Sequence, residues 1–389
     1  MSDLRGAARL AVDATAGVTE IVEEMHASIA RIPTTLGGPV GAVVNGITWL
    51  VYRTIHGVTR ATGGGLDVAL ARLPPAVARE SSQRREAFLA ALNGVVGDHL
   101  AATENPLAIA MRFRVQGRPL VLERDALATA LPAATGKILL LVHGLCMNDL
   151  QWTRPRHDHG AALARALGYP AVHLHYNTGR HVSTNGRELA GMLDALIAAW
   201  PVPVDELTIV GHSMGGLVAR SAQHYAAVAG RRWPHLLRNL VFLGTPHHGA
   251  PLERGGHRLH LFVEKTPYAA PLARLGRIRS AGITDLRWGN LVDEDWDGRD
   301  RFARGEDGRR PVPLPDGVRC FTVAATRGTS AGGIVGDGLV PVASALGRHA
   351  DPRHVLRFPP SHAHVASGTG HLELLERPDL SHRIAAWLR

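Results

Sequence analysis

The order of apolar and polar positions divides the chain into a helical first third and an alternating remainder. Before residue 112, apolar residues recur at helical spacing in three stretches, over residues 18–32, 40–58 and 88–100. Runs of glycine or proline separate these stretches, as is usual between helices. The pattern therefore predicts an N-terminal helical region over residues 1–111.

The stretch over residues 39–58 is the most apolar part of this region. Its simplest interpretation is a helix packed on its neighbours or on the main domain, because Asn45, Thr48 and Arg53 interrupt its apolar face. The alternative is a helix that lies in a membrane interface and makes peripheral contact with lipid. No uninterrupted apolar run is long enough to span a bilayer, and no secretory signal is recognisable, so we expect a cytoplasmic protein.

From Arg112 onward the pattern favours strands. Residues 111–123 predict two short strands about a turn at Gly117–Pro119. Helical patterns then alternate with short apolar runs typical of buried parallel strands: KILLLVHG, YPAVHLHY, ELTIVGHS, NLVFLGTP and RCFTVAAT. The alternation predicts an α/β fold with a mostly parallel central sheet over residues 112–389.

The clearest of the intervening helices covers residues 189–200, and we expect its capping residues at Ser183–Asn185. Residues 250–315 break the alternation and are rich in arginine, glycine, proline and aspartate. Such an insertion forms either a cap over an active site or a solvated surface excursion, and its position in the chain favours a cap.

Composition narrows the functional classes. With 389 residues, 45% of them hydrophobic, the chain can bury a large core. The formal net charge is +9, and all but two of the 43 basic residues are arginines. They are scattered rather than gathered in a stripe with aromatic residues, which favours a solvated surface over nucleic-acid binding. Cys146 and Cys320 provide neither a disulfide framework nor a zinc-binding spacing.

One serine stands at a corner between a predicted strand and a predicted helix. Gly211-His212-Ser213-Met214-Gly215 fits the pattern G-x-S-x-G, in which small neighbours allow a sharp turn that lifts the hydroxyl clear of the sheet. Ser213 as an ordinary turn residue is the alternative. A serine hydroxyl is a poor nucleophile without a base, so the remaining machinery has to appear elsewhere in the chain.

That machinery follows in a suggestive order. Leu145 comes directly after the apolar run that ends in His143-Gly144, and its N–H and that of Met214 are candidate oxyanion donors. Asp337 lies in a glycine-rich loop after RCFTVAAT, and His371 lies in a loop before the last helix. The order Ser213, Asp337, His371 is the one that an α/β-hydrolase triad requires.

Other residues compete for the same roles. Asp351 is the rival acid, and His362 and His364 are rivals of His371. Asp351 follows a polar stretch rather than a strand end, whereas His371 stands just before a helix.

Three further clusters have alternative interpretations. His157 and His159 could bind a metal, but a helix start is preferred there, and His247-His248 could line the cleft. Glu373 and Asp316 could brace the histidine loop through calcium, but we do not favour a metal site.

The motifs LVHGL, YNTGRHVSTNG, VGHSMGGLVAR, LGTPHHGAP, GDGLVP and GHLELL together resemble the α/β-hydrolase superfamily, most nearly its bacterial lipase and PGAP1-like esterase branch. The resemblance covers roughly residues 112–389. It implies Ser213, Asp337 and His371 as a triad, and Leu145 and Met214 as oxyanion donors. It also implies that residues 250–315 help to form an acyl-binding cap.

The expected function is a serine esterase or lipase that cleaves a small-molecule or lipid carboxylic ester, with no organic cofactor. An acyltransferase or thioesterase with the same triad is the first alternative, because the triad does not distinguish water from another acceptor. A non-catalytic, membrane-associated scaffold of the same fold is the second.

Overall fold

The computed structural model describes residues 5–7, 9, 83–250, 279–300, 307–328 and 336–389. The helices expected over residues 18–32 and 40–58 lie outside the described residues. By its internal contacts the chain divides into two compact units, Met1–Ser81 with Leu100–Ala108, and Ser82–His99 with Ile109–Arg389. The boundary expected near residue 112 stays a prediction.

The second unit is built on a mostly parallel sheet. Within the described residues, eight strands pair in the order β10-β9-β8-β7-β3-β6-β1-β2. The six from β10 to β6 run parallel, whereas β1 is antiparallel to both of its neighbours. Their bounds are β1 Arg112–Val115, β2 Arg118–Pro119, β3 Lys137–Val142, β6 Ala171–His175, β7 Glu206–His212, β8 Leu237–Leu243, β9 Arg319–Thr326 and β10 Ala363–Ser367. The five apolar runs and the two short strands predicted from the sequence are all present, and the predicted α/β fold is confirmed.

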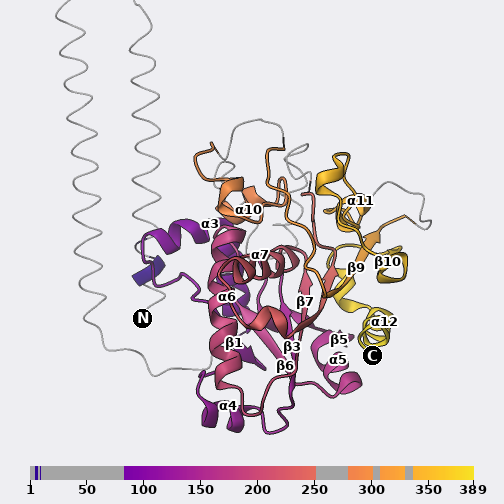
Figure 1. Cartoon of the computed structure of the whole chain (residues 1–389). Helices are drawn as coiled ribbons and strands as arrows, with labels where there is room; N and C mark the ends of the chain where they lie inside the picture. The colour runs from indigo at the N-terminus through magenta and orange to yellow at the C-terminus, as the bar shows by residue number, and fades with distance from the viewer. Residues whose placement is uncertain (1–4, 8, 10–82, 251–278, 301–306, 329–335) are drawn as a thin grey trace, which may run out of the picture. The chain divides into compact units, whose positions relative to one another are not determined.

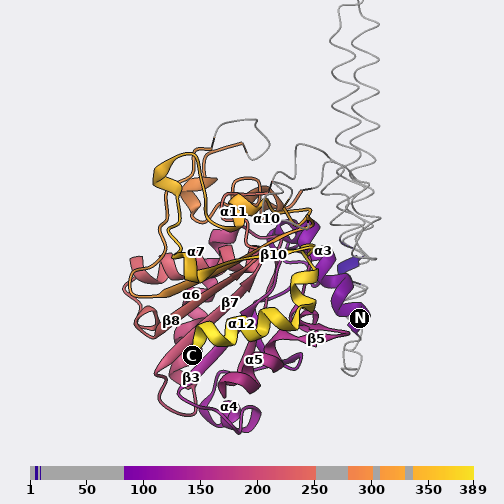
Figure 2. The ribbon, with the colours of Figure 1, turned by 90° about the vertical axis from the view of Figure 1, so that its right-hand side faces the viewer.

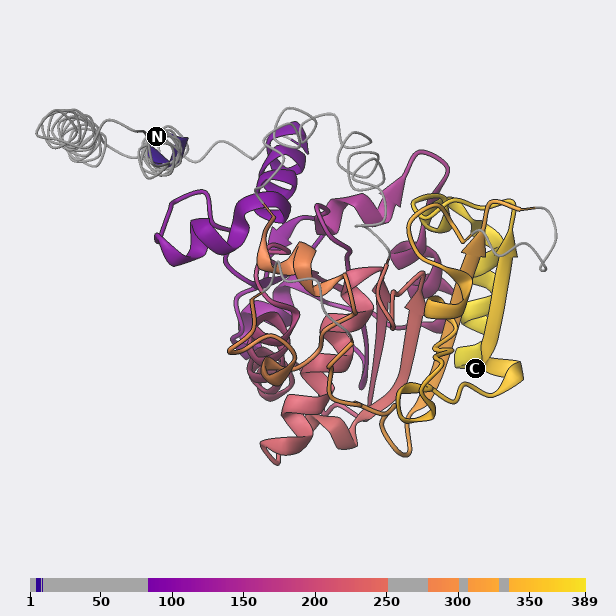
Figure 3. The ribbon, with the colours of Figure 1, turned by 90° about the horizontal axis from the view of Figure 1, so that it is seen from above.

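Helices cover both faces of this sheet (Figures 1 and 2). Viewed from above, α5 and α12 lie on one face, and α6 and α7 on the other (Figure 3). The described helices are α3 Gln83–Ala102, α4 Arg124–Ala130, α5 His159–Leu167, α6 Val182–Ala199, α7 Met214–Val228, α10 Ala281–Asp285, α11 Val342–Ala345 and α12 Pro378–Leu388. Two short β-strands, β4 Thr153–Arg154 and β5 His157–Asp158, form a separate hairpin.

Alternation along the central strands explains this layering. Leu139 and Leu141 of β3 point into one core cluster, together with Leu163 of α5 and Leu380 and Ile384 of α12. Ile138, Leu140 and Val142, which alternate with them on β3, are equally buried but face the opposite side. Because both faces are covered, these strands appear in the sequence as continuous apolar runs.

The helix expected over residues 189–200 begins earlier than its sequence suggests. Helix α6 starts at Val182, so Ser183–Asn185 lie inside its first turn instead of capping it. The cap comes from far along the chain, since the Asp285 carboxylate accepts the Val182 N–H at 2.8 Å. That acceptor satisfies an N–H that has no partner within the helix.

Among the described residues, no helix combines the length and the apolar character that a membrane crossing requires.

Candidate active site

The residues singled out in the sequence follow the carboxyl ends of parallel strands. Leu145 comes after β3, Ser213 after β7, Asp337 in the loop after β9, and His371 after β10. The chain crosses from β3 to β6 on one side and returns to β7 on the other, so a topological switch point lies between β3 and β7. In open α/β sheets, ligands bind beyond the carboxyl ends of the strands at such a switch point.

Ser213 stands in a strained corner. Its φ is 54° and its ψ is −125°, a backbone conformation that a residue with a side chain rarely adopts. A Cβ at Gly215 would lie 2.6 Å from the carbonyl oxygen of His143, so only glycine allows α7 to approach β3 so closely. The Ser213 N–H donates to the Leu243 carbonyl at 2.8 Å, which fixes the corner to β8. The predicted strand–turn–helix context of this serine is therefore present.

The structure joins Asp337 and His371. The imidazole Nδ1 of His371 lies 2.7 Å from Oδ2 of Asp337, and both side chains are buried. The other carboxylate oxygen accepts the N–H groups of Leu339 and Val340, at 2.9 and 2.8 Å. The His371 N–H also donates to the Asp337 carbonyl at 3.2 Å. This fully engaged carboxylate can hold the imidazole in one orientation, with Nδ1 protonated and Nε2 available as a base.

The His371 imidazole lies against the serine corner. A Cβ at Gly244 would be 3.2 Å from Nδ1 of His371. Gly244 is the residue after Leu243, whose carbonyl accepts the Ser213 N–H. The ring of His212, the residue before the serine, is 4.9 Å from the ring of His371. His212 Nε2 also lies 3.3 Å from the His371 carbonyl oxygen, which assigns the proton to that nitrogen. Burial and the neighbouring His371 hold the pKa of His212 well below its ordinary value, so His212 is neutral.

The predicted oxyanion donors flank the serine. Met214 is the first residue of α7, and a Cβ at Gly144, next to Leu145, would lie 3.0 Å from Ser213 Cβ. Within the described residues, the N–H groups of Leu145 and Met214 donate to no backbone carbonyl. The first N–H groups of a helix have no intrahelical acceptor, so α7 presents Met214 in this way by its geometry alone.

Two of the rival residues, Asp351 and His362, are engaged elsewhere. Asp351 pairs with Arg353 at 2.7 Å, and His362 Nδ1 lies 3.1 Å from the Cys320 carbonyl oxygen. At His157–His159 the chain starts a helix, as preferred: Asp158 is the N-cap of α5 and accepts the Ala161 N–H at 2.7 Å.

Glu373, one of the two residues weighed for calcium, has a local role. Glu373 accepts the Gly370 N–H at 2.7 Å, within the histidine loop itself. Among the described residues, no group of three or more His, Cys, Asp or Glu side chains is arranged to hold a metal ion.

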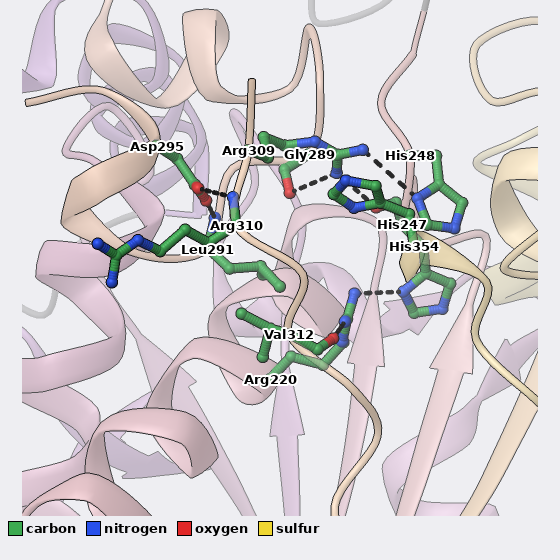
Figure 4. Close-up of a pocket in the computed structure, with 10 residues that line it drawn as sticks. All are labelled: Arg220, His247, His248, Gly289, Leu291, Asp295, Arg309, Arg310, Val312 and His354. Carbon is green, nitrogen blue, oxygen red and sulfur yellow. Dashed lines mark hydrogen bonds between the residues drawn. The ribbon is translucent and has the colours of Figure 1, made fainter. Parts of the chain in front are cut away.

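His247 and His248 line a separate pocket beside α7, which contains none of the predicted triad (Figure 4). Arg220 of α7 donates there to the Val312 carbonyl and to Nδ1 of His247, and Arg309 donates to the His247 carbonyl at 3.0 Å. Burial and the nearby Arg309 lower the pKa of Arg220 to about 9. The sequence did not single out this arginine network, because its partners come from distant segments.

Arg309 is neutralised inside the same pocket by Asp307, which accepts two of its N–H groups at 2.8 and 2.7 Å. Asp295 accepts the N–H groups of Leu291 and Arg310, each at 2.8 Å. We interpret the pocket as a polar brace between α7 and residues 289–295 and 309–312.

The model of the PGAP1-like α/β domain family matches residues 133–309, which include Leu145, Ser213 and Met214 but neither Asp337 nor His371. The resemblance inferred from the motifs is thereby confirmed. A search of curated protein sequences gave no match.

The solved structures that are similar at low identity include lipases and esterases. A Bacillus licheniformis lipase in its mature form is 19% identical, with a TM-score of 0.41, over 64% of this chain and 90% of that one. A Pyrococcus furiosus esterase is 14% identical, with a TM-score of 0.38, over 65% of this chain and 83% of that one. A Staphylococcus hyicus lipase is 14% identical, with a TM-score of 0.38, over 65% of this chain and 95% of that one.

Proposed function

We propose that this protein hydrolyses carboxylic esters through an acyl-enzyme on Ser213. Its α/β-hydrolase fold and its match to the PGAP1-like α/β domain over residues 133–309 support this proposal. The observation that carries the proposal is the buried His371–Asp337 pair, joined at 2.7 Å and lying against the strained serine corner.

The proposed reaction has two halves, acylation and deacylation of Ser213, and acylation comes first. The Ser213 oxygen attacks the ester carbonyl carbon while its proton passes to Nε2 of His371, and the imidazolium is stabilised by Asp337. The carbonyl oxygen becomes an oxyanion between the N–H groups of Leu145 and Met214, where one such donor typically lowers the barrier by ~3–4 kcal/mol. The intermediate collapses, and the alcohol leaves with the proton from His371.

Water completes the cycle. It attacks the acyl carbon, gives its proton to His371, and the carboxylic acid is released as Ser213 recovers its hydrogen. Chemistry of this kind needs no metal or organic cofactor. We also propose that the ester substrate has an apolar acyl chain and that residues 250–315 form a cap over the site.

The test is hydrolysis of p-nitrophenyl esters from acetate to palmitate by the native protein and by Ser213→Ala. We expect the substitution to lower kcat/KM by at least about 10⁴-fold, since no other group supplies the nucleophile. Ser361→Ala, at an exposed serine, is the matched control and should leave the rate unchanged. Equal rates for the native protein and Ser213→Ala would refute the proposal.

A further inference from the structure

Helix α3 lies outside the residues that match the family model, yet its middle packs on the turn that carries Leu145. The helix is kinked there: Val96 has φ −132° and ψ 19°, and it stands between Gly94 and Gly97. A kink of this kind interrupts the regular hydrogen bonds of a helix, so the freed backbone groups need hydrogen-bond partners from outside the helix.

Side chains from two other segments donate hydrogen bonds to the backbone carbonyls at the kink. Ser280 Oγ donates to the Gly94 carbonyl at 2.6 Å, and Asn177 Nδ2 donates to the Gly97 carbonyl at 2.8 Å. The Asp98 carboxylate accepts the Ala281 N–H at 2.9 Å, at the first residue of α10, which lies beside α3 in Figure 1. The kinked face is therefore fixed to the loop after β6 and to the start of α10.

The same face leaves no space for a side chain. A Cβ at Gly94 would lie 2.9 Å from Cα and 3.0 Å from N of Cys146, and it would overlap Cys146 Sγ. A Cβ at Gly97 would lie 2.8 Å from the carboxamide carbon of Asn177. Glycine at both positions is what lets the helix backbone touch these two loops.

The contacted turn is itself strained. The Met147 N–H donates to the Gly144 carbonyl at 3.3 Å and closes a turn with Leu145 and Cys146 at its centre. Cys146 has φ 57°, at a position where a type II turn usually carries glycine. A left-handed residue with a side chain costs roughly 1–2 kcal/mol, so surrounding contacts must hold it. They come from α3 on one side and from Thr178 Oγ, which accepts the Cys146 N–H at 3.1 Å, on the other.

We propose that the Gly94–Gly97 face of α3 is a positioning element for the turn Gly144–Met147, and that with Thr178 it sets the direction of the Leu145 N–H. The catalytic consequence rests on the proposed function, in which this N–H is an oxyanion donor. The structural half, an ordered turn held by α3, stands independently of it.

The main test is Gly94→Ala, with Gly191→Ala in α6 as the matched control. At Gly191 the nearest atom to a new Cβ is a flexible Arg231 nitrogen at 3.7 Å, so alanine fits. In Gly94→Ala we expect amide hydrogen exchange in residues 144–148 to rise at least tenfold. We also expect kcat on p-nitrophenyl butyrate to fall by about 10²-fold with KM within threefold, as for loss of one oxyanion donor. Gly191→Ala should show neither change.

A rescue tests the contact directly. Cys146→Gly removes Sγ and accepts the positive φ without strain, so Gly94→Ala combined with Cys146→Gly should recover a measurable part of the lost kcat, although the contacts of the new Cβ with Cα and N of residue 146 remain. A milder pair covers the case in which Gly94→Ala does not fold: Thr178→Val should loosen the turn and lower kcat, while Thr178→Ser should keep both native.

The outcomes separate the two proposals. Unchanged exchange of residues 144–148 in folded Gly94→Ala would overturn the role of α3, and native exchange and kcat in Thr178→Val would overturn that of Thr178. Increased exchange in a protein whose native form cleaves no ester would support the structural half and refute only the esterase.

Discussion

Among the described residues, His371 and His181 each rest on a buried carboxylate, but of these two only His371 lies beside the serine corner. His371 is 2.7 Å from Asp337, and His181 Nδ1 is 3.0 and 3.1 Å from the two oxygens of Asp285. In both places Nδ1 of the imidazole lies within hydrogen-bond distance of a buried carboxylate, on one oxygen in Asp337 and on both in Asp285.

The surroundings of the two pairs differ. The ring of His181 stacks on Trp296, with centroids 3.7 Å apart and planes within 6°. Its partner Asp285 also caps α6 through Val182 and accepts from Asn290 at 3.0 Å. A histidine–carboxylate pair is thus a general device for fixing an imidazole, and it becomes a candidate for catalysis only where a nucleophile and oxyanion donors are within reach.

The largest expected effect distinguishes the two carboxylates. Asp337→Asn should lower kcat/KM by about 10⁴-fold, because Oδ1 stays bound to the Leu339 and Val340 N–H groups and the new amide then faces Nδ1 of His371. The ring must adopt the other tautomer, and Nε2 carries the proton. Steady-state kinetics on p-nitrophenyl butyrate measure this, and Asp285→Asn is the control, expected within threefold of native.

The second prediction concerns stability. His181→Ala should lower the free energy of unfolding by about 1–3 kcal/mol, because Asp285 loses a hydrogen-bond donor and Trp296 loses its stacking partner. Urea denaturation followed by tryptophan fluorescence measures it. A native midpoint would show that the pair contributes nothing to the fold.

A third histidine, without a carboxylate partner, gives a pH dependence. His159 is buried, and its Nε2 donates to the Leu374 carbonyl at 2.9 Å while Nδ1 accepts from Ser381. Burial lowers its pKa to about 4. Between about pH 6.5 and pH 4, His159 is therefore protonated in the unfolded chain but neutral in the folded chain. The free energy of unfolding falls as the pH drops through this range, by at most ~1.4 kcal/mol per pH unit.

His159→Gln tests this dependence, since it cannot titrate. Urea midpoints between pH 7.5 and 4.5 should decline less steeply for the variant than for native protein. Parallel declines would assign the pH dependence to other buried groups.

The smallest effect is expected at the rival acid. Asp351 is bound by Arg353 at an exposed site, so Asp351→Asn should leave kcat/KM within twofold. A loss comparable to that of Asp337→Asn would transfer the role of the acid to Asp351.

Much of the fold was predictable from local pattern. The buried parallel strands appear as apolar runs, and the serine corner carries its own glycines. The links made by distant residues were not predictable, because they depend on side chains that meet only after folding. Asp285 replaces the expected cap of α6, and Ser280 and Asn177 complete the kink in α3.

The most direct test of the comparison is the rate at which a fluorophosphonate labels Ser213 in His371→Ala and in His181→Ala. If the imidazole on Asp337 activates the serine, labelling should fall by at least about 10³-fold in His371→Ala and stay within threefold of native in His181→Ala. Native-like labelling of His371→Ala would contradict the account.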